Sequence, residues 1–171
     1  NLVGHHQSAF VRGRSLHDNF MLVQATARRL HALKMPTIML KLDISKAFDS
    51  IQWPFIIEVL TRLGFGRRWI SWMCGVLATS STRVMINGIP GKPFYACKGL
   101  RQGAALSPMV FILCMEPLHR LFKLAAEKGL LAPLARSSAH QRVSMFADDV
   151  MVFFKPLELE SRVCRAILDE F

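Results

Sequence analysis

The spacing of apolar residues in the first third of the chain predicts one helix followed by one strand. Apolar side chains recur at helical spacing over residues 16–30, after a capping pattern that begins at Ser15. Pro36 closes this segment, and residues 37–43 then alternate apolar and polar side chains, as half-buried strands do. The strand is therefore expected to present Asp43 at its carboxyl end.

The middle of the chain has mainly helical periodicity. Residues 47–63 and, roughly, 67–79 each repeat apolar side chains at helical spacing. A longer helix is expected to start at Ser107, to kink near Pro117 and to end at Gly129.

Strand patterns surround these helices. Residues 83–86 are expected to form a strand that turns at Asn87-Gly88 and pairs with 94–97, before a loop over 99–103. A polar connection over 133–140 should follow the long helix.

Two apolar runs near the end of the chain, 142–146 and 150–154, flank Ala147-Asp148-Asp149 and predict a second hairpin. The order of elements, with no internal repeat or long linker, indicates a single α+β domain with a small antiparallel sheet packed on helices.

Composition narrows the classes of function. The 171 residues are 51% hydrophobic and carry 22 basic against 12 acidic side chains, a net charge of +10. This chain can bury a core, and its charge favours a polyanionic partner such as nucleic acid. The uncharged stretch 69–82 is shorter than the ~20 residues of a spanning helix, so no membrane association is expected. The first twenty residues contain charges and no apolar run, so no secretory signal is expected.

The cysteines and histidines suggest no metal or disulfide framework. The four cysteines are widely spaced among apolar neighbours and are expected to be reduced core thiols. His5 and His6 lack nearby acidic or cysteine partners in the sequence, so we expect them to be polar surface residues. The chain has no initiator Met and stops within a predicted helix, which suggests an excerpt from a longer protein.

The aspartates are concentrated in two places, Asp43 with Asp49 and Asp148 with Asp149. Adjacent acids between apolar strands repel each other, and a bound divalent cation removes that cost. A strand-end acid and a hairpin-tip pair favour Mg²⁺, with Mn²⁺ as a possible substitute, in two-metal chemistry at phosphorus. The alternative is that Asp148-Asp149 only forms the turn.

Four segments, in order, resemble the reverse transcriptases of non-LTR (LINE-like) retrotransposons. They are QSAFVRGR (7–14), LDISKAFD (42–49), GLRQG followed by LSP (99–108), and FADD (146–149). The resemblance implies a right-hand polymerase fold, with part of the fingers in residues 1–36 and the palm in 37–171. It also implies that the upstream fingers and the thumb lie outside this chain.

The resemblance assigns roles to individual residues. Asp43 and Asp148 would be the main metal ligands, Asp149 a third acid, and the carbonyl of Ile44 a further ligand. Phe48 would be the steric gate that excludes a ribose 2′-hydroxyl, although an ordinary core position is the alternative. The other residues with implied contacts to nucleotide, triphosphate or nucleic acid are Arg101, Gln102, Gly103, Arg12 and Arg14. Solvated surface remains the alternative for the arginines, and a helix-dipole role remains one for Asp49.

The implied activity is RNA-directed DNA polymerisation from an RNA template, a DNA primer and dNTPs, in an intracellular and nuclear protein. Two alternatives stay open: a catalytically inactive remnant that binds nucleic acid, and a group II intron-like reverse transcriptase. The sequence departs from the family at Ala104-Ala105, where Asp-Pro is common, and at Phe146, where Tyr is usual. The first departure removes a carboxylate and a rigid residue from the loop.

Overall fold

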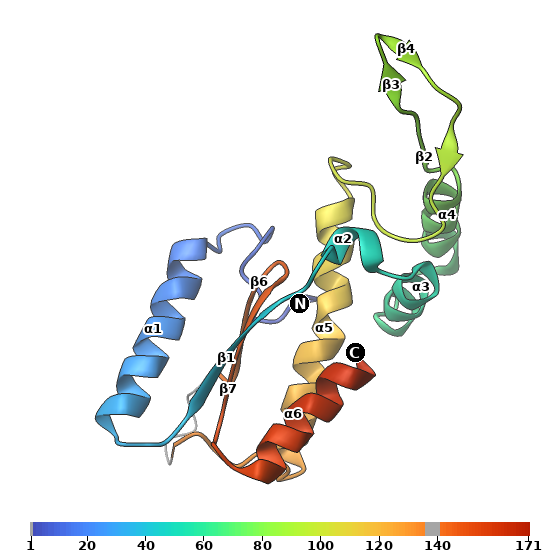
Figure 1. The fold of residues 1–171 in the computed structure, drawn as a ribbon. Coiled ribbons are helices and arrows are strands. Elements are labelled where there is room, and N and C mark those ends of the chain that lie inside the picture. Colours follow the sequence, from blue (N-terminus) through green and yellow to red (C-terminus); the bar gives the residue numbers. More distant parts are fainter. Residues whose placement is uncertain (1, 136–140) are drawn as a thin grey trace. The chain divides into compact units, whose positions relative to one another are not determined.

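The structure is a computed structural model that describes residues 2–135 and 141–171. It divides into two compact units, which we treat separately (Figure 1). The sheet unit comprises Asn1–Ile44 and Met115–Phe171, and the helical unit comprises Ser45–Cys114. The expected division at residue 36 is a different boundary and stays a prediction. Most of the expected connection over 133–140 lies outside the described residues.

The predicted small antiparallel sheet is confirmed in the sheet unit. Its strands are β1 (Ile38–Asp43), β6 (Val143–Phe146) and β7 (Asp149–Phe154), in the order β1-β7-β6. Beyond β6, Gln7 forms a parallel bridge with Met145. Thus the amino-terminal segment, far away in sequence, extends the sheet on its β6 side.

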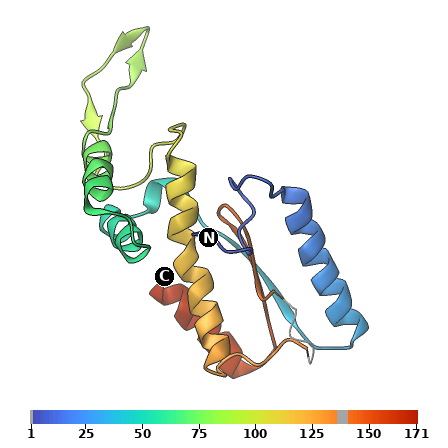
Figure 2. The same ribbon diagram turned by 180° about the vertical axis from the view of Figure 1, so that it is seen from behind.

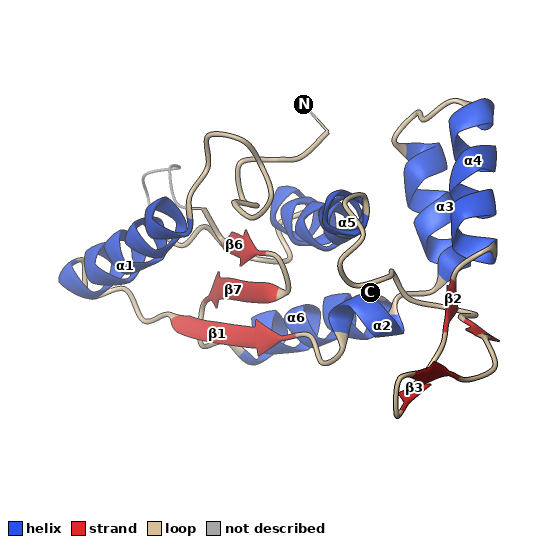
Figure 3. Cartoon of the chain, turned by 90° about the horizontal axis from the view of Figure 1, so that it is seen from above, coloured by secondary structure: helices blue, strands red, loops and turns tan. Residues whose placement is uncertain are grey.

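The two faces of this sheet are covered to different extents. Val150 and Val152 are fully buried on one face, together with Met145 of the neighbouring strand. On the other face, Phe153 packs against Leu30 of α1 (Leu16–Ala32), so α1 covers part of this face. Figures 2 and 3 show α1 on one side of the sheet and α6 (Glu158–Glu170) on the other. The sequence pattern alone did not indicate that helices lie on both sides of the sheet.

The helical unit differs from its prediction between residues 47 and 63. The expected single helix is two: α2 (Ala47–Ser50) and α3 (Trp53–Arg62). A continuous helix would need the backbone carbonyls of Phe48 and Ile51 as acceptors. These carbonyls instead accept hydrogen bonds from the 99–103 loop: Gly99 N–H donates to the Ile51 carbonyl and Leu100 N–H to the Phe48 carbonyl. Pro54, which has no N–H, starts the second helix.

The remaining helices agree with the sequence pattern. They are α4 (Arg67–Ala78) in the helical unit and α5 (Ser107–Glu127), which begins in the helical unit and ends in the sheet unit. Helix α5 continues through Pro117. None of the helices among the described residues is both long enough and apolar enough to span a membrane.

The hairpin expected between residues 83 and 97 has a different pairing. The strand β3 (Met85–Ile86) pairs with β4 (Ile89–Pro90) directly across the Asn87-Gly88 turn. The outer pair is β2 (Ser81–Thr82) with β5 (Phe94–Tyr95). The prediction was wrong because a two-residue Asn-Gly turn pairs the residues next to it, not a segment six residues farther on.

The cysteines are also only partly as expected. All four are free thiols, but Cys74 and Cys97 are exposed, whereas Cys114 and Cys164 are buried. Burial raises the pKa of Cys114 to about 12 and that of Cys164 to about 11. The expectation of four core thiols was therefore wrong for two of them, which lie on the outer side of α4 and in a loop.

Candidate active site

Two of the predicted acidic residues lie directly opposite each other in the sheet. The antiparallel register pairs Asp43, the last residue of β1, with Asp149, the first residue of β7. Directly opposed residues have side chains on the same face with Cβ atoms about 4.5–5.5 Å apart. Both aspartates are exposed. The strand end therefore concentrates negative charge on a solvent-accessible face.

Lys41 is the cation that partly compensates this charge. It lies two residues before Asp43 on the same face, and its Nζ is 3.0 Å from Oδ1 of Asp149. The hydrogen bond and charge of Asp149, together with the charge of Asp43, raise the pKa of Lys41. The exposed ammonium group of Lys41 thus lies near both carboxylates.

The third predicted acid, Asp148, lies in the turn that joins β6 to β7, and it is half-buried. Phe146 pairs with Asp149, so the connection consists of Ala147 and Asp148 alone. Ala147 has a φ of 55°, in the left-handed region that costs an alanine roughly 1–2 kcal/mol. Gln7 accepts the Ala147 N–H through Oε1 at 3.0 Å, and its Nε2 lies 3.4 Å from the Ala147 carbonyl oxygen.

These carboxylates fit a divalent cation by their chemistry. Mg²⁺ usually takes one or two carboxylates and completes its shell with water and substrate phosphates. Asp43 and Asp149 supply two such groups on one exposed face, and Asp148 precedes Asp149 in the chain. Within residues 2–135 and 141–171, no set of three His, Cys, Asp or Glu side chains is grouped as a metal site. The role of all three acids as ligands, and that of the Ile44 carbonyl, stays a prediction.

In the helical unit, the predicted nucleotide-binding loop is held against the segment that contains Phe48. Besides the backbone bonds of Gly99 and Leu100, the indole Nε1 of Trp53 donates to the Gly99 carbonyl at 2.8 Å. Gly99 has a φ of +81°, and a Cβ there would lie 2.9 Å from the carbonyl oxygen of Asp49. Only glycine fits this close approach.

This packing places side chains of both motifs next to each other. Gln102 donates from Nε2 to the Asp49 carboxylate, at 3.2 Å to Oδ1. Phe48 is half-buried, and its ring stacks on Phe111 with ring centroids 4.5 Å apart. Asp49 therefore has a partner that the sequence did not predict, and Phe48 combines a packing contact with partial exposure.

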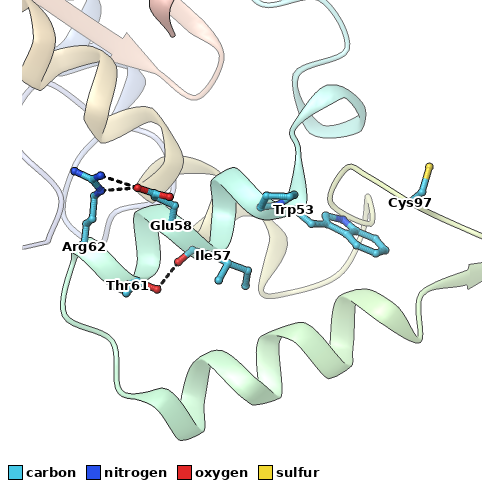
Figure 4. A pocket seen from close by; sticks show the side chains of 7 residues that line it. Trp53, Ile57, Glu58, Thr61, Arg62 and Cys97 are labelled. Atoms are coloured by element: carbon cyan, nitrogen blue, oxygen red, sulfur yellow. Dashed lines mark hydrogen bonds and ion pairs between the residues drawn. The ribbon is translucent and has the colours of Figure 1, made fainter.

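Two pockets flank this loop. One, of about 830 Å³, runs along α3 from Trp53 and Cys97 to the ion pair of Glu58 with Arg62 (Figure 4). The other, of about 250 Å³, opens between α4 and the loop, and its wall includes Arg101 and the family-divergent Ala104. The second pocket borders one of the residues with an implied role in nucleotide binding.

The other predicted residues are in varied surroundings. Arg12, Arg101 and Gly103 are exposed, and Ile44 is half-buried. Arg14 instead donates from its guanidinium to the backbone carbonyls of Val3, Gly4 and Gln7. Phosphate contact by the three arginines stays a prediction, but Arg14 has a structural use that the sequence did not suggest.

The expectation that His6 is a surface residue was wrong. His6 is only 3% exposed, and its Nε2 lies 3.1 Å from Oε1 of Glu116, which also accepts the Gly4 N–H at 2.9 Å. The His6 ring stacks on His119 at 3.5 Å. The acidic partner was missed because it lies on α5, far away in the sequence, and no local spacing reveals it. His5, by contrast, is exposed as expected.

The chain belongs to the reverse transcriptase (RNA-dependent DNA polymerase) family, which matches residues 1–171. It is 29% identical over 153 residues to the transposon TX1 uncharacterized 149 kDa protein of Xenopus laevis, covering 88% of this chain and 11% of that protein. It is also 29% identical over 147 residues to the Pol polyprotein of retrotransposable element R2DM of Drosophila melanogaster, covering 86% of this chain and 13% of that protein.

Solved structures share the fold. Apo telomerase from Candida tropicalis superposes with a TM-score of 0.66 at 14% identity, over 96% of this chain and 32% of that one. Telomerase from Candida albicans, in complex with a fragment of telomeric RNA, gives a TM-score of 0.63 at 13% identity, over 91% and 27%. These likenesses confirm the polymerase fold, and the retrotransposon relatives confirm the resemblance found in the sequence. The chain spans only about an eighth of the two curated relatives.

Proposed function

We propose that this chain is the part of an RNA-directed DNA polymerase that joins a dNTP to the 3′-hydroxyl of a DNA primer on an RNA template. The single observation that carries the proposal is the register of Asp43 with Asp149 at an exposed strand end, in a chain of the reverse transcriptase family. The net charge of +10 supports a nucleic-acid partner.

In this proposal Asp43, Asp148 and Asp149 hold Mg²⁺ or Mn²⁺, with the Ile44 carbonyl as an additional ligand. Such ions supply a lowered pKa for the primer hydroxyl and charge neutralisation for the departing pyrophosphate. The chain itself keeps the carboxylates of Asp43 and Asp149 accessible at the strand end, and Lys41 limits their mutual repulsion.

The helical unit would provide the contacts to the incoming nucleotide. Gln102, Arg101 and Gly103 belong to a loop whose backbone is fixed by its bonds to the 48–53 segment. Arg12 and Arg14 are proposed to contact phosphates, and the exposed Arg12 is free of the backbone contacts that hold Arg14. We further propose a nuclear location, where a DNA target is available.

Phe48 is proposed to exclude ribonucleotides. Its ring is braced by Phe111, so replacement by a smaller side chain opens space without removing the ring beneath it. We expect Phe48→Val to raise the efficiency of rNTP incorporation relative to dNTP by about ten- to a hundredfold, as loss of a steric clash does. Single-nucleotide insertion kinetics measure this ratio, with Phe65→Val, in the connection between α3 and α4, as the control. An unchanged ratio would remove Phe48 as the gate.

The activity is tested by primer extension with the complete reading frame that encodes this chain. Extension on poly(A)/oligo(dT) with Mg²⁺ that exceeds extension on a DNA template supports the proposal. Binding of RNA without extension would indicate the inactive remnant. Extension that requires a structured intron RNA would indicate the group II intron-like alternative. Binding should weaken steeply with salt.

A further inference from the structure

The turn that contains Asp148 has an alanine at a position where the backbone φ is positive. A two-residue hairpin connection with positive φ at its first residue normally has glycine there. This chain has Ala147, with a φ of 55°. Its backbone must therefore be stabilised in this conformation by something else.

Gln7 supplies the missing stabilisation. Its side chain is fully buried, at 0% exposure, and 140 residues separate it from Ala147. Oε1 accepts N–H groups from both Ala9 and Ala147, at 2.9 and 3.0 Å, while Nε2 faces the Ala147 carbonyl oxygen. One side chain thus contacts both polar backbone groups of the residue before Asp148.

The backbone around Gln7 is itself fixed. Ser8 N–H donates to the Met145 carbonyl, and Met145 N–H donates to the His6 carbonyl, so residues 6–8 run along β6. Arg14 donates to the carbonyl of Gln7 at 2.6 Å. The backbone of Gln7 is therefore held in place, and this fixes the point from which its side chain extends to the Ala147 turn.

We propose that Gln7 is a positioning residue for Asp148, holding the Ala147 turn in the conformation that presents this carboxylate to a divalent cation. This inference rests on the proposed function for the part that concerns the cation. Gln7 itself touches neither substrate nor metal in this scheme. Its amide serves as a neutral acceptor, which adds no charge beside the acids.

The test uses the complete protein and two variants of Gln7. Gln7→Leu keeps the volume but removes the acceptor, whereas Gln7→Glu keeps Oε1 as an acceptor for both amides. Gln141→Leu is the matched control, because the Gln141 amide also donates to a backbone carbonyl, that of Val143, but at the end of β6 away from the Ala147 turn. Folding of each variant is checked by circular dichroism.

The first measurement is amide hydrogen exchange at Ala147, which does not depend on activity. We expect exchange to accelerate about tenfold in Gln7→Leu, as loss of a hydrogen bond implies, and to stay within about threefold of wild type in Gln7→Glu and Gln141→Leu. Unchanged exchange in Gln7→Leu, or equal acceleration in the control, overturns the proposal. Should Gln7→Leu not fold, loss of Ala147 protection in a folded Gln7→Glu variant overturns it.

The second measurement is the affinity for the cation. The Kd for Mn²⁺, measured by calorimetric titration, should rise about tenfold in Gln7→Leu. The Mg²⁺ concentration at half-maximal extension should rise by a similar factor. The KM for dNTP should not change. No shift in either overturns the positioning role. An active Asp148→Asn variant would instead refute the proposed function, while the exchange data would still decide whether Gln7 holds the turn.

Discussion

Two pairs of carboxylates in the sheet unit differ in how the chain satisfies them. Asp43 and Asp149 are exposed and opposed in register, and Lys41 is the cation beside them. Glu116 and Glu160 are buried, at 4% and 2% exposure, and each accepts at least one hydrogen bond from a backbone N–H. In the absence of a ligand the two carboxylates of the first pair repel each other, whereas those of the second pair already have hydrogen-bond donors within the protein.

The buried group shows how this fold satisfies a charge that it needs for itself. Glu160 accepts N–H groups from Ala132 and Lys155, at 3.0 and 2.8 Å, and lies 3.8 Å from the guanidinium of Arg142. Burial lowers the pKa of Arg142, opposed by the charge of Glu160. A carboxylate with a structural role thus has several fixed donors. Within the part of the chain that the structure describes, Asp43 and Asp149 have no such set of backbone donors, and this distinguishes a group available to an external cation.

Replacing an acid of the strand end or of the adjoining turn should therefore affect activity and leave the fold intact. We expect Asp43→Asn or Asp148→Asn to reduce primer extension by a thousandfold or more, corresponding to about 4 kcal/mol of transition-state stabilisation. Stability should stay the same or rise slightly, because one like-charge contact is removed. Steady-state kinetics and urea denaturation measure the two effects, with Asp18→Asn as the control. Substantial residual activity in either variant would contradict the metal role.

Replacing a buried acid should instead lower the stability of the fold. Glu160→Ala leaves two backbone amides without their acceptor and the Arg142 guanidinium without its nearby carboxylate, and we expect a loss of about 3 kcal/mol in the free energy of unfolding. Glu127, which is exposed and pairs only with Lys123 on the same helix, provides the control, and its replacement by alanine should cost close to nothing. Equal losses of unfolding free energy in the Glu160 and Glu127 variants would show that burial does not determine how much a carboxylate contributes to stability.

The His6–Glu116–His119 cluster should give the sheet unit a dependence on pH. Burial lowers the pKa of His119 from 6.5 to about 4, so the unfolded chain binds this proton at a higher pH than the folded chain. Burial alone would raise the pKa of Glu116, but the contacts with His6 and the Gly4 amide outweigh it and lower the value. Both groups therefore bind protons more weakly when folded, and acid should destabilise the fold.

The expected size follows from linkage. Stability should fall by about 2 kcal/mol between pH 6.5 and 4, less than the full shift of His119 because its ring is partly accessible. Below pH 4.5 the contribution of Glu116 is lost in addition. Chemical denaturation at a series of pH values measures this, and His119→Phe should flatten the profile above pH 4.5. A similar flattening by His31→Phe, on the exposed side of α1, would refute the assignment.

The sequence was informative wherever local pattern decides structure. The alternation of apolar and polar residues predicted β1 with Asp43 at its end. The two apolar runs predicted the hairpin that contains Asp148 and Asp149. The family resemblance connected these distant segments. Pairing in register within one sheet is a consequence of tertiary structure, and periodicity alone could not provide it.

The misses share a physical cause, which is that the deciding partner is distant in the sequence. The break between α2 and α3 depends on carbonyls that bond to the loop at Gly99 and Leu100, about fifty residues later. The burial of His6 depends on Glu116, and the role of Gln7 depends on Ala147. For such residues the local signal is weak: a histidine pair or a glutamine in a polar segment is typical of surface.

The crowding around Gly99 also makes this position a marker for the history of related gene copies. A codon for glycine becomes one for a larger residue by almost any change at its first two bases, and the backbone of Asp49 leaves no space for it. Gly75, by contrast, lies in α4 with an ordinary φ and open surroundings, and alanine fits there. In a retroelement lineage that still transposes, purifying selection should preserve codon 99 while codon 75 drifts; in genomic fossils the two should decay at the same pace.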